Sequence, residues 1–303
     1  MSDDSRNYQF KIESNDSRID SFLSKEIPDC SRSYIQKLIS DNNVLVNDKS
    51  TKANYKLKAG DIIDVTIPEL VDLLIEAEDI KLDIVYEDDD IIVINKPKGM
   101  VVHPAAGHSS GTLVNALIYH CKDDLSGING ELRPGIVHRI DKDTTGLIVA
   151  CKNDNAHRFI ADQLAVHSIT RRYHAIVYGN IKDDEGVINA PIYRHPNDRK
   201  KMAVVPNGKK AITHYKVLKR FGDFTYIECE LETGRTHQIR VHMAYIKHPL
   251  LGDDIYGPKA KKYNLEGQCL HAKTLGFIHP STKEYIEFDS ELPEYFSNLL
   301  KML

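Results

Sequence analysis

Two kinds of sequence meet in residues 135–152, which read Gly135-Ile-Val-His-Arg-Ile-Asp-Lys-Asp-Thr-Thr-Gly-Leu-Ile-Val-Ala-Cys-Lys152. Leu147 to Cys151 is a short apolar run with branched residues at its centre, which predicts a buried strand. The residues before it are polar and dense in charge, and Gly146 permits a tight turn into the strand. Charged side chains on a loop braced by a buried strand are typical of functional sites, although a solvated turn is the simpler interpretation of such letters alone.

A specific resemblance is carried by ten consecutive residues, His138-Arg-Ile-Asp-Lys-Asp-Thr-Thr-Gly-Leu147. They closely resemble the catalytic motif of the RluA/RluD-type pseudouridine synthases, with Ile140 in place of the more usual leucine. The resemblance implies that Asp141 is the essential aspartate of that family. It also implies that Arg139 fills the space left by a flipped base and that His138 contacts the substrate.

Two further segments continue this resemblance, residues 95–104 (Asn-Lys-Pro-Lys-Gly-Met-Val-Val-His-Pro) and residues 231–244 (Leu-Glu-Thr-Gly-Arg-Thr-His-Gln-Ile-Arg-Val-His-Met-Ala). Tyr173 matches the active-site aromatic of the family, whereas strand tyrosines in general are most often packing residues. Arg240 matches the arginine that pairs with the catalytic aspartate. The other substrate contacts that we predict in this part of the chain are Lys96 and Arg235.

Length and composition describe an ordinary globular chain of one large and one small domain, with 303 residues, 41% of them hydrophobic and 28% charged. No apolar run is long enough to span a bilayer, and the first residues lack a signal-peptide pattern. Five cysteines are scattered singly without a Cys-x-x-Cys pair, which favours reduced thiols in the cytoplasm over a disulfide frame or a zinc site. We also expect a monomer.

The distribution of charge favours a nucleic-acid partner although the formal net charge is −4. Residues 171–220 hold twelve Lys and Arg against four Asp and Glu, whereas residues 76–90 are strongly acidic. A segregated basic region can bind phosphates whatever the total charge. A solvated basic surface remains the alternative, and it applies equally to residues 194–210, for which we expect a basic, mobile surface loop.

Residues 11–68 have the pattern of a separate small module. Helical spacing of apolar residues predicts helices at 18–25 and after Ser31, which can cap the second one, and strands follow at 44–47 and 61–67. This order, with the letters of residues 31–39 and 44–47, resembles an S4 RNA-binding domain. The resemblance implies phosphate contacts from Arg32, Lys37 and Lys52. Residues 1–75 hold ten basic and thirteen acidic side chains, so only a local patch of the module can bind RNA.

We therefore predict an α+β protein with an S4-like α/β module at residues 11–75, a linker near 68–78 and a catalytic domain at 80–303. The catalytic domain should have the pseudouridine synthase fold, a mixed, mostly antiparallel sheet flanked by helices and loops. Apolar patterning places its elements as follows: strands at 82–87, 90–95, 147–151, 171–179, 211–220, 224–231, 269–277 and 285–289, and helices at 112–121, 156–167, from about 239, and 293–301. His157 and His167 are expected at the surface of their helix.

The predicted reaction needs no cofactor, because breaking the bond between ribose C1′ and uracil N1 and rejoining the base through C5 is an isomerisation. We find no glycine-rich phosphate loop, and a zinc site at His103 and His108 is not expected, because they lie five residues apart with Pro104 and Gly107 between them. A buried carboxylate tends to gain a proton, and a neighbouring guanidinium opposes this, which suits Asp141 and Arg240.

Alternative functions remain open. We expect an RNA pseudouridine synthase that acts on large-subunit (23S) ribosomal RNA, but tRNA or another RNA could be the substrate. A non-catalytic RNA-binding protein on an inactive scaffold is a second possibility. A hydrolase with Asp141 and Asp143 as paired carboxylates is a third, although neighbours two residues apart on a turn generally diverge.

Overall fold

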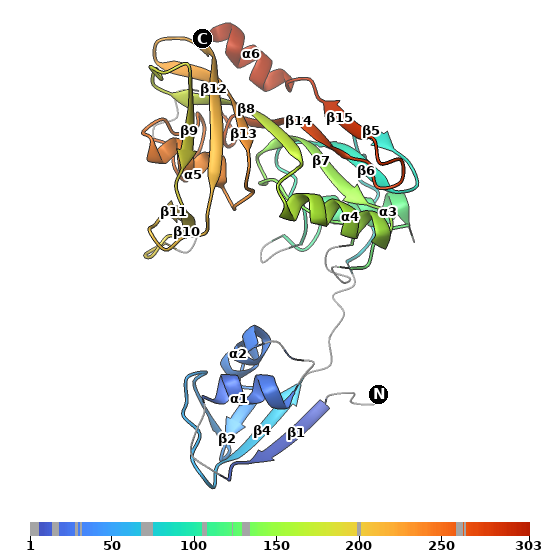
Figure 1. Cartoon of the computed structure of the whole chain (residues 1–303), viewed down its shortest axis with the longest axis vertical. Helices are drawn as coiled ribbons and strands as arrows, with labels where there is room; N and C mark the ends of the chain where they lie inside the picture. The colour runs from blue at the N-terminus through green and yellow to red at the C-terminus, as the bar shows by residue number, and fades with distance from the viewer. Residues whose placement is uncertain are drawn as a thin grey trace. The chain divides into compact units, whose positions relative to one another are not determined.

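A computed structural model describes residues 6–13, 18–27, 30, 32–67, 75–104, 108–122, 124–128, 134–198, 201–258, 263 and 265–303. The chain divides into two compact units, Met1–Leu73 and Leu74–Leu303 (Figure 1). Of the predicted linker, residues 68–74 lie outside the described residues, and residues 75–83 have no regular secondary structure.

The smaller unit packs two helices on an antiparallel sheet of strand order β1-β4-β2-β3. Buried apolar side chains of both helices, Ile19, Leu23, Ile35 and Leu38 among them, form its core with the inward side of β4. The predicted helices and the two predicted strands are confirmed, and Ser31 lies outside the described residues. The elements are β1 (Arg6–Lys11), α1 (Ile19–Glu26), α2 (Arg32–Ser40), β2 (Val44–Val46), β3 (Lys49–Ser50) and β4 (Ile62–Ile67).

We did not predict β1 and β3 from the sequence. The first reads Arg-Asn-Tyr-Gln-Phe-Lys, with two aromatic residues among polar ones, and it becomes a strand by pairing along its whole length with β4. The second is only two residues long. Both owe their conformation to a neighbouring strand, which a local pattern does not report.

The larger unit is built on a mixed sheet of nine described strands in the order β5-β6-β7-β14-β8-β13-β12-β9, with β15 paired to β14. Among the described strands only β7 and β14 run parallel, so the predicted mostly antiparallel sheet is confirmed. Its strands are β5 (Ile84–Glu87), β6 (Ile91–Lys96), β7 (Thr145–Cys151), β8 (Thr170–Tyr178), β9 (Glu185–Asn189), β12 (Ile212–Arg220), β13 (Phe224–Leu231), β14 (Leu270–Ile278) and β15 (Tyr285–Asp289).

Strand β7 is buried at every position and separates two hydrophobic cores. Its Ile148 and Ala150 face a large core with α3 and α5, whereas Leu147, Val149 and Cys151 face another core with α4. This alternation explains the unbroken apolar run in the sequence, since both faces of a central strand are covered. The helices of this unit are α3 (Leu113–Cys121), α4 (Asp154–Ala165), α5 (Gln238–Tyr245) and α6 (Glu294–Met302).

Gly146, near the start of β7, does more than permit the turn that we predicted: it allows β7 and β14 to approach each other closely. Gly146 lies inside the strand with a φ of +105°, and a Cβ added there would come within 2.3 Å of the Ala272 carbonyl oxygen of β14. Both the backbone conformation and the missing side chain are therefore required at this position. They bring the loop that precedes β7 against the centre of the sheet.

Two expectations about the larger unit are wrong. His157 is buried, with 3% exposure, because it lies on the side of α4 that faces the protein, whereas His167 is exposed as expected. Residues 194–210 are not simply a loop: β10 (Ile192–Arg194) and β11 (Met202–Val204) form an antiparallel hairpin, and α5 packs against β11. Residues 199–200 within this segment lie outside the described residues.

Candidate active site

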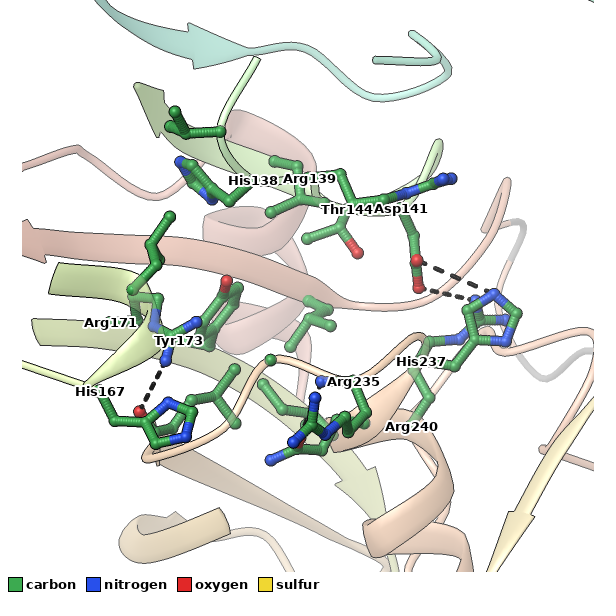
Figure 2. A pocket seen from close by; sticks show the side chains of 18 of the residues that line it. His138, Arg139, Asp141, Thr144, His167, Arg171, Tyr173, Arg235, His237 and Arg240 are labelled. Carbon is green, nitrogen blue, oxygen red and sulfur yellow. Dashed lines mark hydrogen bonds and ion pairs between the residues drawn. The ribbon is translucent and has the colours of Figure 1, made fainter. Parts of the chain in front are cut away.

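The charged loop before β7 forms one wall of a cavity of about 580 Å³ (Figure 2). Its opposite wall comes from the loop before α5 and from β8, two segments far from it in sequence. The loop is closed by a turn in which the Thr144 N–H donates to the Asp141 carbonyl at 3.1 Å. The polar lining residues include His138, Arg139, Asp141, Thr144, Arg171, Tyr173, Arg235, His237 and Arg240.

Lys96 hydrogen-bonds the backbone of this loop at Lys142 and does not line the cavity. Its ammonium is fully buried and donates to the carbonyl oxygens of Pro97, Met100 and Lys142 at 2.8–2.9 Å. Burial lowers the pKa of Lys96 to about 7, although Asp143 and Asp141 favour the charged form. The three acceptors require the ammonium, because a neutral amine has only two N–H donors. The predicted substrate contact of Lys96 is therefore wrong: its donors are used within the protein.

Asp141 and Arg240 form the predicted pair, but Arg240 has a second and more buried partner. The Arg240 Nη1 atom donates to Asp141 Oδ2 at 2.9 Å. Its Nε and Nη2 atoms donate to the two carboxylate oxygens of Asp253 at 2.7 and 3.0 Å, which is the bidentate geometry that favours arginine. The Asp253 side chain is 0% exposed, whereas that of Asp141 is 19% exposed. Arg240 is thus oriented by a buried carboxylate and presents its remaining side to an accessible one.

Asp253 is a site residue that the sequence did not reveal as one. Its Oδ1 also accepts the backbone N–H groups of Ile255 and Tyr256 at 2.9 and 3.0 Å, so its carboxylate fixes its own loop as well as Arg240. Burial disfavours the charge of Arg240, but the hydrogen bonds and charges of Asp253 and Asp141 raise its pKa above the ordinary value. Its only sequence signal is that residues 248–257 (His-Pro-Leu-Leu-Gly-Asp-Asp-Ile-Tyr-Gly) also continue the family resemblance.

His237 lies on the other side of the Asp141 carboxylate. Its Nε2 atom is 3.8 Å from Asp141 Oδ1, and its Nδ1 atom is 2.9 Å from the Tyr256 hydroxyl oxygen. That oxygen already accepts the Met202 N–H at 2.8 Å, so its own proton is available to His237 Nδ1. Burial lowers the pKa of His237. We infer a neutral imidazole with its proton on Nε2, directed toward Asp141.

The loop before α5 has a conformation fixed by one glutamine. Gln238 accepts hydrogen bonds from Thr233 and from the Arg235 backbone N–H, and its amide nitrogen donates to Ile212 and Thr213 of β12. His237 has a φ of 56°, which ends the loop and starts the helix. The helix then points Arg240 toward the cavity.

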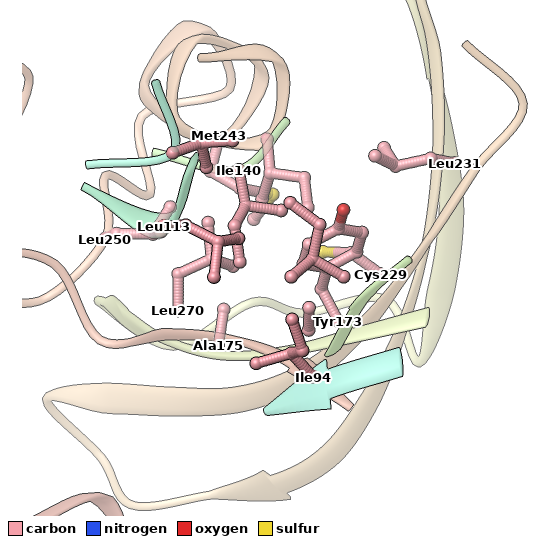
Figure 3. Close-up of a cluster of buried hydrophobic side chains, with 14 of the residues drawn as sticks. Ile94, Leu113, Ile140, Tyr173, Ala175, Cys229, Leu231, Met243, Leu250 and Leu270 are labelled. Atoms are coloured by element: carbon pink, nitrogen blue, oxygen red, sulfur yellow. The ribbon is translucent and has the colours of Figure 1, made fainter. Parts of the chain in front are cut away.

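Tyr173 forms the floor of the cavity and belongs to the main hydrophobic core. Figure 3 shows its ring among Ile140, Cys229 and Leu231, and the residue is only 8% exposed. Burial raises the pKa of Tyr173, with a smaller opposite effect from Arg171, so the phenol is neutral at physiological pH. A rigid, flat, neutral aromatic at this place is suited to stacking on a planar base.

The other substrate contacts that we predicted in the larger unit also line the cavity, and they differ in exposure and in hydrogen bonding. Arg139 is exposed and its Nη1 is 3.4 Å from His103 Nε2. His138 Nε2 accepts the Val149 N–H at 3.1 Å, and burial lowers the pKa of His138 to about 3. Arg235 is partly exposed and donates from Nε to the Lys210 carbonyl. The structure thus brings His138, Arg139 and Arg235 together with Asp141.

In the smaller unit, Arg32 has a structural partner. Its Nε and Nη2 atoms lie 3.2 and 3.1 Å from Asp20 Oδ2, and Arg18 pairs with the same carboxylate. Asp20 is completely buried; these hydrogen bonds and that of Gln36 outweigh the effect of burial and lower its pKa to about 2. Arg32 therefore joins α1 to α2, whereas Lys37 and Lys52 are exposed.

The site turn is also tied to β14 by a buried histidine. His271, with 1% exposure, has Nδ1 2.8 Å from Thr145 Oγ1 and Nε2 2.9 Å from Ser290 Oγ. The Ser290 hydroxyl can donate to the Ala272 and Lys273 carbonyls, so His271 donates from Nε2 and accepts at Nδ1 as a neutral ring. Burial, chiefly, lowers its pKa to about 4.

This neutral histidine should weaken the fold in acid. The folded pKa of about 4 lies below the unfolded value of 6.5, so its contribution is complete above pH 6.5 and is lost as the pH falls toward 4. Between pH 7.5 and 5 the free energy of unfolding should fall by about 2 kcal/mol through this group. Urea unfolding of His271→Asn should show that much less pH dependence than the wild type. The exposed control, His167→Asn, should keep the wild-type slope, and an unchanged slope in His271→Asn would contradict the assignment.

Among the described residues, one group has the composition of a metal site, Asp88, Asp90 and His279, whose ligand atoms lie within 4.8 Å of one another. His279 Nε2 is 2.7 Å from Asp88 Oδ2, and Asp90 bonds Ser281 and Asn153, so the group is a hydrogen-bond network. None of its members lines the cavity. No described helix has the length and apolar character needed to cross a membrane.

Comparison with known proteins agrees with this geometry. Residues 90–245 match the family described as RNA pseudouridylate synthase, and residues 17–63 match the S4 domain. A solved structure titled Human RNA Pseudouridylate Synthase Domain Containing 4 is similar, with 25% identity and a TM-score of 0.57, over 72% of this chain and 91% of that one. The chain belongs to the RNA pseudouridine synthase family, and it is an isomerase that acts on RNA.

Two bacterial relatives are similar along almost the whole chain, including the S4 domain. A Bacillus subtilis protein named uncharacterized RNA pseudouridine synthase YlyB is 55% identical over 286 residues, 94% of each chain. A Zymomonas mobilis protein named ribosomal large subunit pseudouridine synthase D is 48% identical over 301 residues, 94% of this chain and 93% of that one. The recognised resemblance and the predicted fold class are thereby confirmed.

Proposed function

We propose that Asp141 is the carboxylate that reacts with the substrate, that Tyr173 stacks on the uracil and that Arg240 positions Asp141. The observation that carries this proposal is the 2.9 Å pair of Asp141 and Arg240 at the wall of a cavity whose floor is Tyr173. Arg240 keeps a charge beside Asp141 because Asp253 holds the guanidinium from the other side. The carboxylate is therefore held in one orientation beside a cation, while 19% of its side-chain surface stays accessible.

The reacting atoms of a uridine are inaccessible inside an RNA helix, so the base must leave the stack to reach this cavity. The volume of about 580 Å³ leaves room for a pyrimidine and part of its ribose. Arg139 is exposed at the rim, next to Asp141 in sequence, and we propose that it occupies the space that the flipped base vacates. His138 and Arg235 complete the proposed substrate contacts of the cavity.

We propose large-subunit (23S) ribosomal RNA as the substrate. Support comes from the relative in Zymomonas mobilis, and from one in Pasteurella multocida at 45% identity, which are both named ribosomal large subunit pseudouridine synthase D. Chemical mapping of pseudouridines in RNA from cells with and without the protein tests this directly. Loss of pseudouridine from large-subunit rRNA alone is the expected result. Loss from tRNA only would contradict the proposal and favour the alternative substrate.

The hydrolase alternative loses its structural basis. Asp143 does not line the cavity; its side chain lies against Gly267, where an added Cβ would come within 2.5 Å of the Asp143 Cβ. Asp141 and Asp143 therefore do not flank one reacting bond. A non-catalytic RNA-binding protein would not need an accessible carboxylate, Asp141, that is oriented by Arg240 and Asp253.

We propose that the S4-like module, residues 11–75, supplies phosphate contacts while the catalytic domain, residues 80–303, carries out the reaction. Lys37 and Lys52 are the contacts to test, because substitution of Arg32 would also remove one of the two arginines that pair with the buried Asp20. Replacing both lysines by glutamine should weaken rRNA binding and flatten the slope of log affinity against log salt by about 0.9 per lost contact, if the duplex DNA value applies. The single-turnover rate at saturating RNA should stay unchanged.

The matched control for this experiment is the pair Lys37→Arg and Lys52→Arg, which keeps the charge and should retain both affinity and salt slope. If the glutamine variants bind with wild-type affinity and salt dependence, these lysines are not phosphate contacts.

A monomeric, cytoplasmic enzyme is the remaining part of the proposal. The aspartate, aromatic and arginine of the site come from a single chain, so a second copy is not needed to complete it. The five cysteines are buried, and Cys121, Cys151, Cys229 and Cys269 are free thiols, which suits a reducing compartment. Light scattering of the purified protein should give the mass of one chain.

A further inference from the structure

The cavity extends past Tyr173 to a further cation, Arg171, which the reaction proposed at Asp141 does not use. Arg171 lies two residues before Tyr173 on β8, so both side chains point to the same face of the strand. Figure 2 shows Arg171 on the opposite side of Tyr173 from Asp141 and His237. The residue is only 7% exposed, yet it lines the cavity. A charged group thus stands at each end of the aromatic floor.

Arg171 is incompletely satisfied within the described part of the protein. Its Nη2 atom donates to the carbonyl oxygens of Leu231 and Glu232 at 3.4 and 3.2 Å. Its buried Nε atom has no acceptor among the described residues, and no described carboxylate forms an ion pair with it. Burial lowers the pKa of Arg171 somewhat, but an arginine stays charged. A buried cation without an anion is unfavourable, and the fold retains it at the wall of a functional cavity.

The loop before α5 leaves room for this guanidinium. A Cβ added to Gly234, in the loop before α5, would lie 2.8 Å from Arg171 Nη1. Even an alanine at position 234 would therefore displace the arginine. By contrast, the neighbouring Arg172 points to the other face of the sheet, is partly exposed and lies near Glu230 and Glu287. The two adjacent arginines have the same chemistry and opposite environments.

The geometry of uracil relates the two ends of the cavity. Position C6 and the ribose-bearing N1 lie on one side of the ring, and the edge formed by O2, N3 and O4 lies on the other. If Asp141 meets the C1′ and C6 side of a base stacked on Tyr173, the carbonyl edge is directed toward Arg171. Flipped bases are commonly read by hydrogen bonds to that edge. This step depends on the role proposed above for Asp141.

We propose that Arg171 determines base specificity by donating a hydrogen bond to a carbonyl oxygen on the O2–N3–O4 edge of the flipped uracil. Both uracil oxygens are acceptors, whereas cytosine presents an amino donor at position 4. A buried guanidinium is only a donor, so contact at O4 selects uracil over cytosine, and contact at O2 orients the ring without that selection. Arg171 takes no part in bond breaking; it orients the base relative to Asp141.

The test uses the full-length enzyme and the RNA segment that carries the mapped target, with uridine, 4-thiouridine or 2-thiouridine at that position. Sulfur accepts hydrogen bonds less well than oxygen, and its intrinsic effect on the reaction is common to every enzyme variant. Single-turnover pseudouridine formation gives a preference for uridine over each analogue. In Arg171→Met, the preference against one of the two analogues should fall by about tenfold relative to wild type. Arg171→Lys should give an intermediate value, and the matched control Arg172→Met should keep the wild-type preference.

Each preference is a ratio within one variant, so partial misfolding cancels, and Arg171→Lys decides the matter if the methionine variant does not fold. Unchanged preferences for both analogues would overturn the proposal. If the rate of pseudouridine formation falls equally with all three RNAs, and the size of this fall depends on salt concentration, the proposal is overturned in favour of a phosphate contact. Asp141→Asn in the same assay tests the proposed role of Asp141 separately from that of Arg171. If that variant is active, the proposed catalytic role fails; if it is inactive while preferences in the Arg171 variants do not change, only the role of Arg171 fails.

Discussion

Asp141→Asn should abolish turnover while leaving the folded structure and RNA binding intact. Asparagine has nearly the same volume and keeps a carbonyl oxygen that can accept the hydrogen bond from Arg240 Nη1, so the pair loses charge rather than contact. Partial exposure of Asp141 also makes a large effect on stability unexpected. Because Asp141 is proposed to react with the base, the rate should fall by at least about a thousandfold, which corresponds to roughly 4 kcal/mol of activation free energy.

Release of tritium from RNA labelled at uridine C5 measures this loss, since exchange at C5 accompanies isomerisation. Asp143→Asn is the matched control, because Asp143 carries the same group on the same turn but does not line the cavity. It should retain activity within about tenfold of wild type, or ~1.4 kcal/mol. Activity of Asp141→Asn within that same range would exclude Asp141 as the reacting group.

Arg240→Met should destabilise the fold as well as inactivate the enzyme, and the main reason is Asp253 rather than Asp141. Removing the guanidinium leaves the Asp253 carboxylate, which is 0% exposed, without its bidentate partner. Breaking a buried ion pair from one side costs about 3–5 kcal/mol. Activity should fall in parallel, because Asp141 loses the group that orients it.

A double-mutant cycle distinguishes the two carboxylates. Urea unfolding of Arg240→Met, Asp253→Asn and the double variant should show a coupling of about 2 kcal/mol or more between Arg240 and Asp253. The matching cycle with Asp141→Asn should show a smaller coupling in stability, since Asp141 keeps access to water. Additive stability changes for Arg240 and Asp253 would mean that Asp253 does not hold the arginine.

The sequence predicted secondary structure correctly where a strand is buried on both faces or where apolar residues recur at a regular helical spacing. The apolar run of β7 and the helical spacing in α1 predicted those elements, because each burial pattern is written into neighbouring residues. Strands β1 and β9 were missed, since one is largely polar and the other contains a glycine. Both are edge strands that depend on a partner, β4 and β12 respectively.

The sequence by itself determined the fold class and the residues that we propose for the reaction. Asp141, Tyr173 and Arg240 were predicted because short contiguous segments resemble the motifs of a known family, and such a resemblance is carried by neighbouring residues. A separate resemblance, at residues 31–39 and 44–47, predicted an S4-like module before the catalytic domain. None of these inferences required knowing which segments lie side by side.

Only the tertiary structure decided how those residues are supported. Lys96 and Asp141 looked equally available to a substrate in the sequence, yet Lys96 is fully buried on three carbonyl oxygens and Asp141 faces the cavity. Asp253 is a partner of Arg240, and the Nε atom of Arg171 has no acceptor among the described residues. The physical reason is that burial and hydrogen-bond partners are set by segments that pack together from distant parts of the chain, such as β6 against the turn at Asp141. No local sequence pattern shows which distant segments will pack together. The charge of a side chain can therefore be read from the sequence, but its burial and its hydrogen-bond partners cannot.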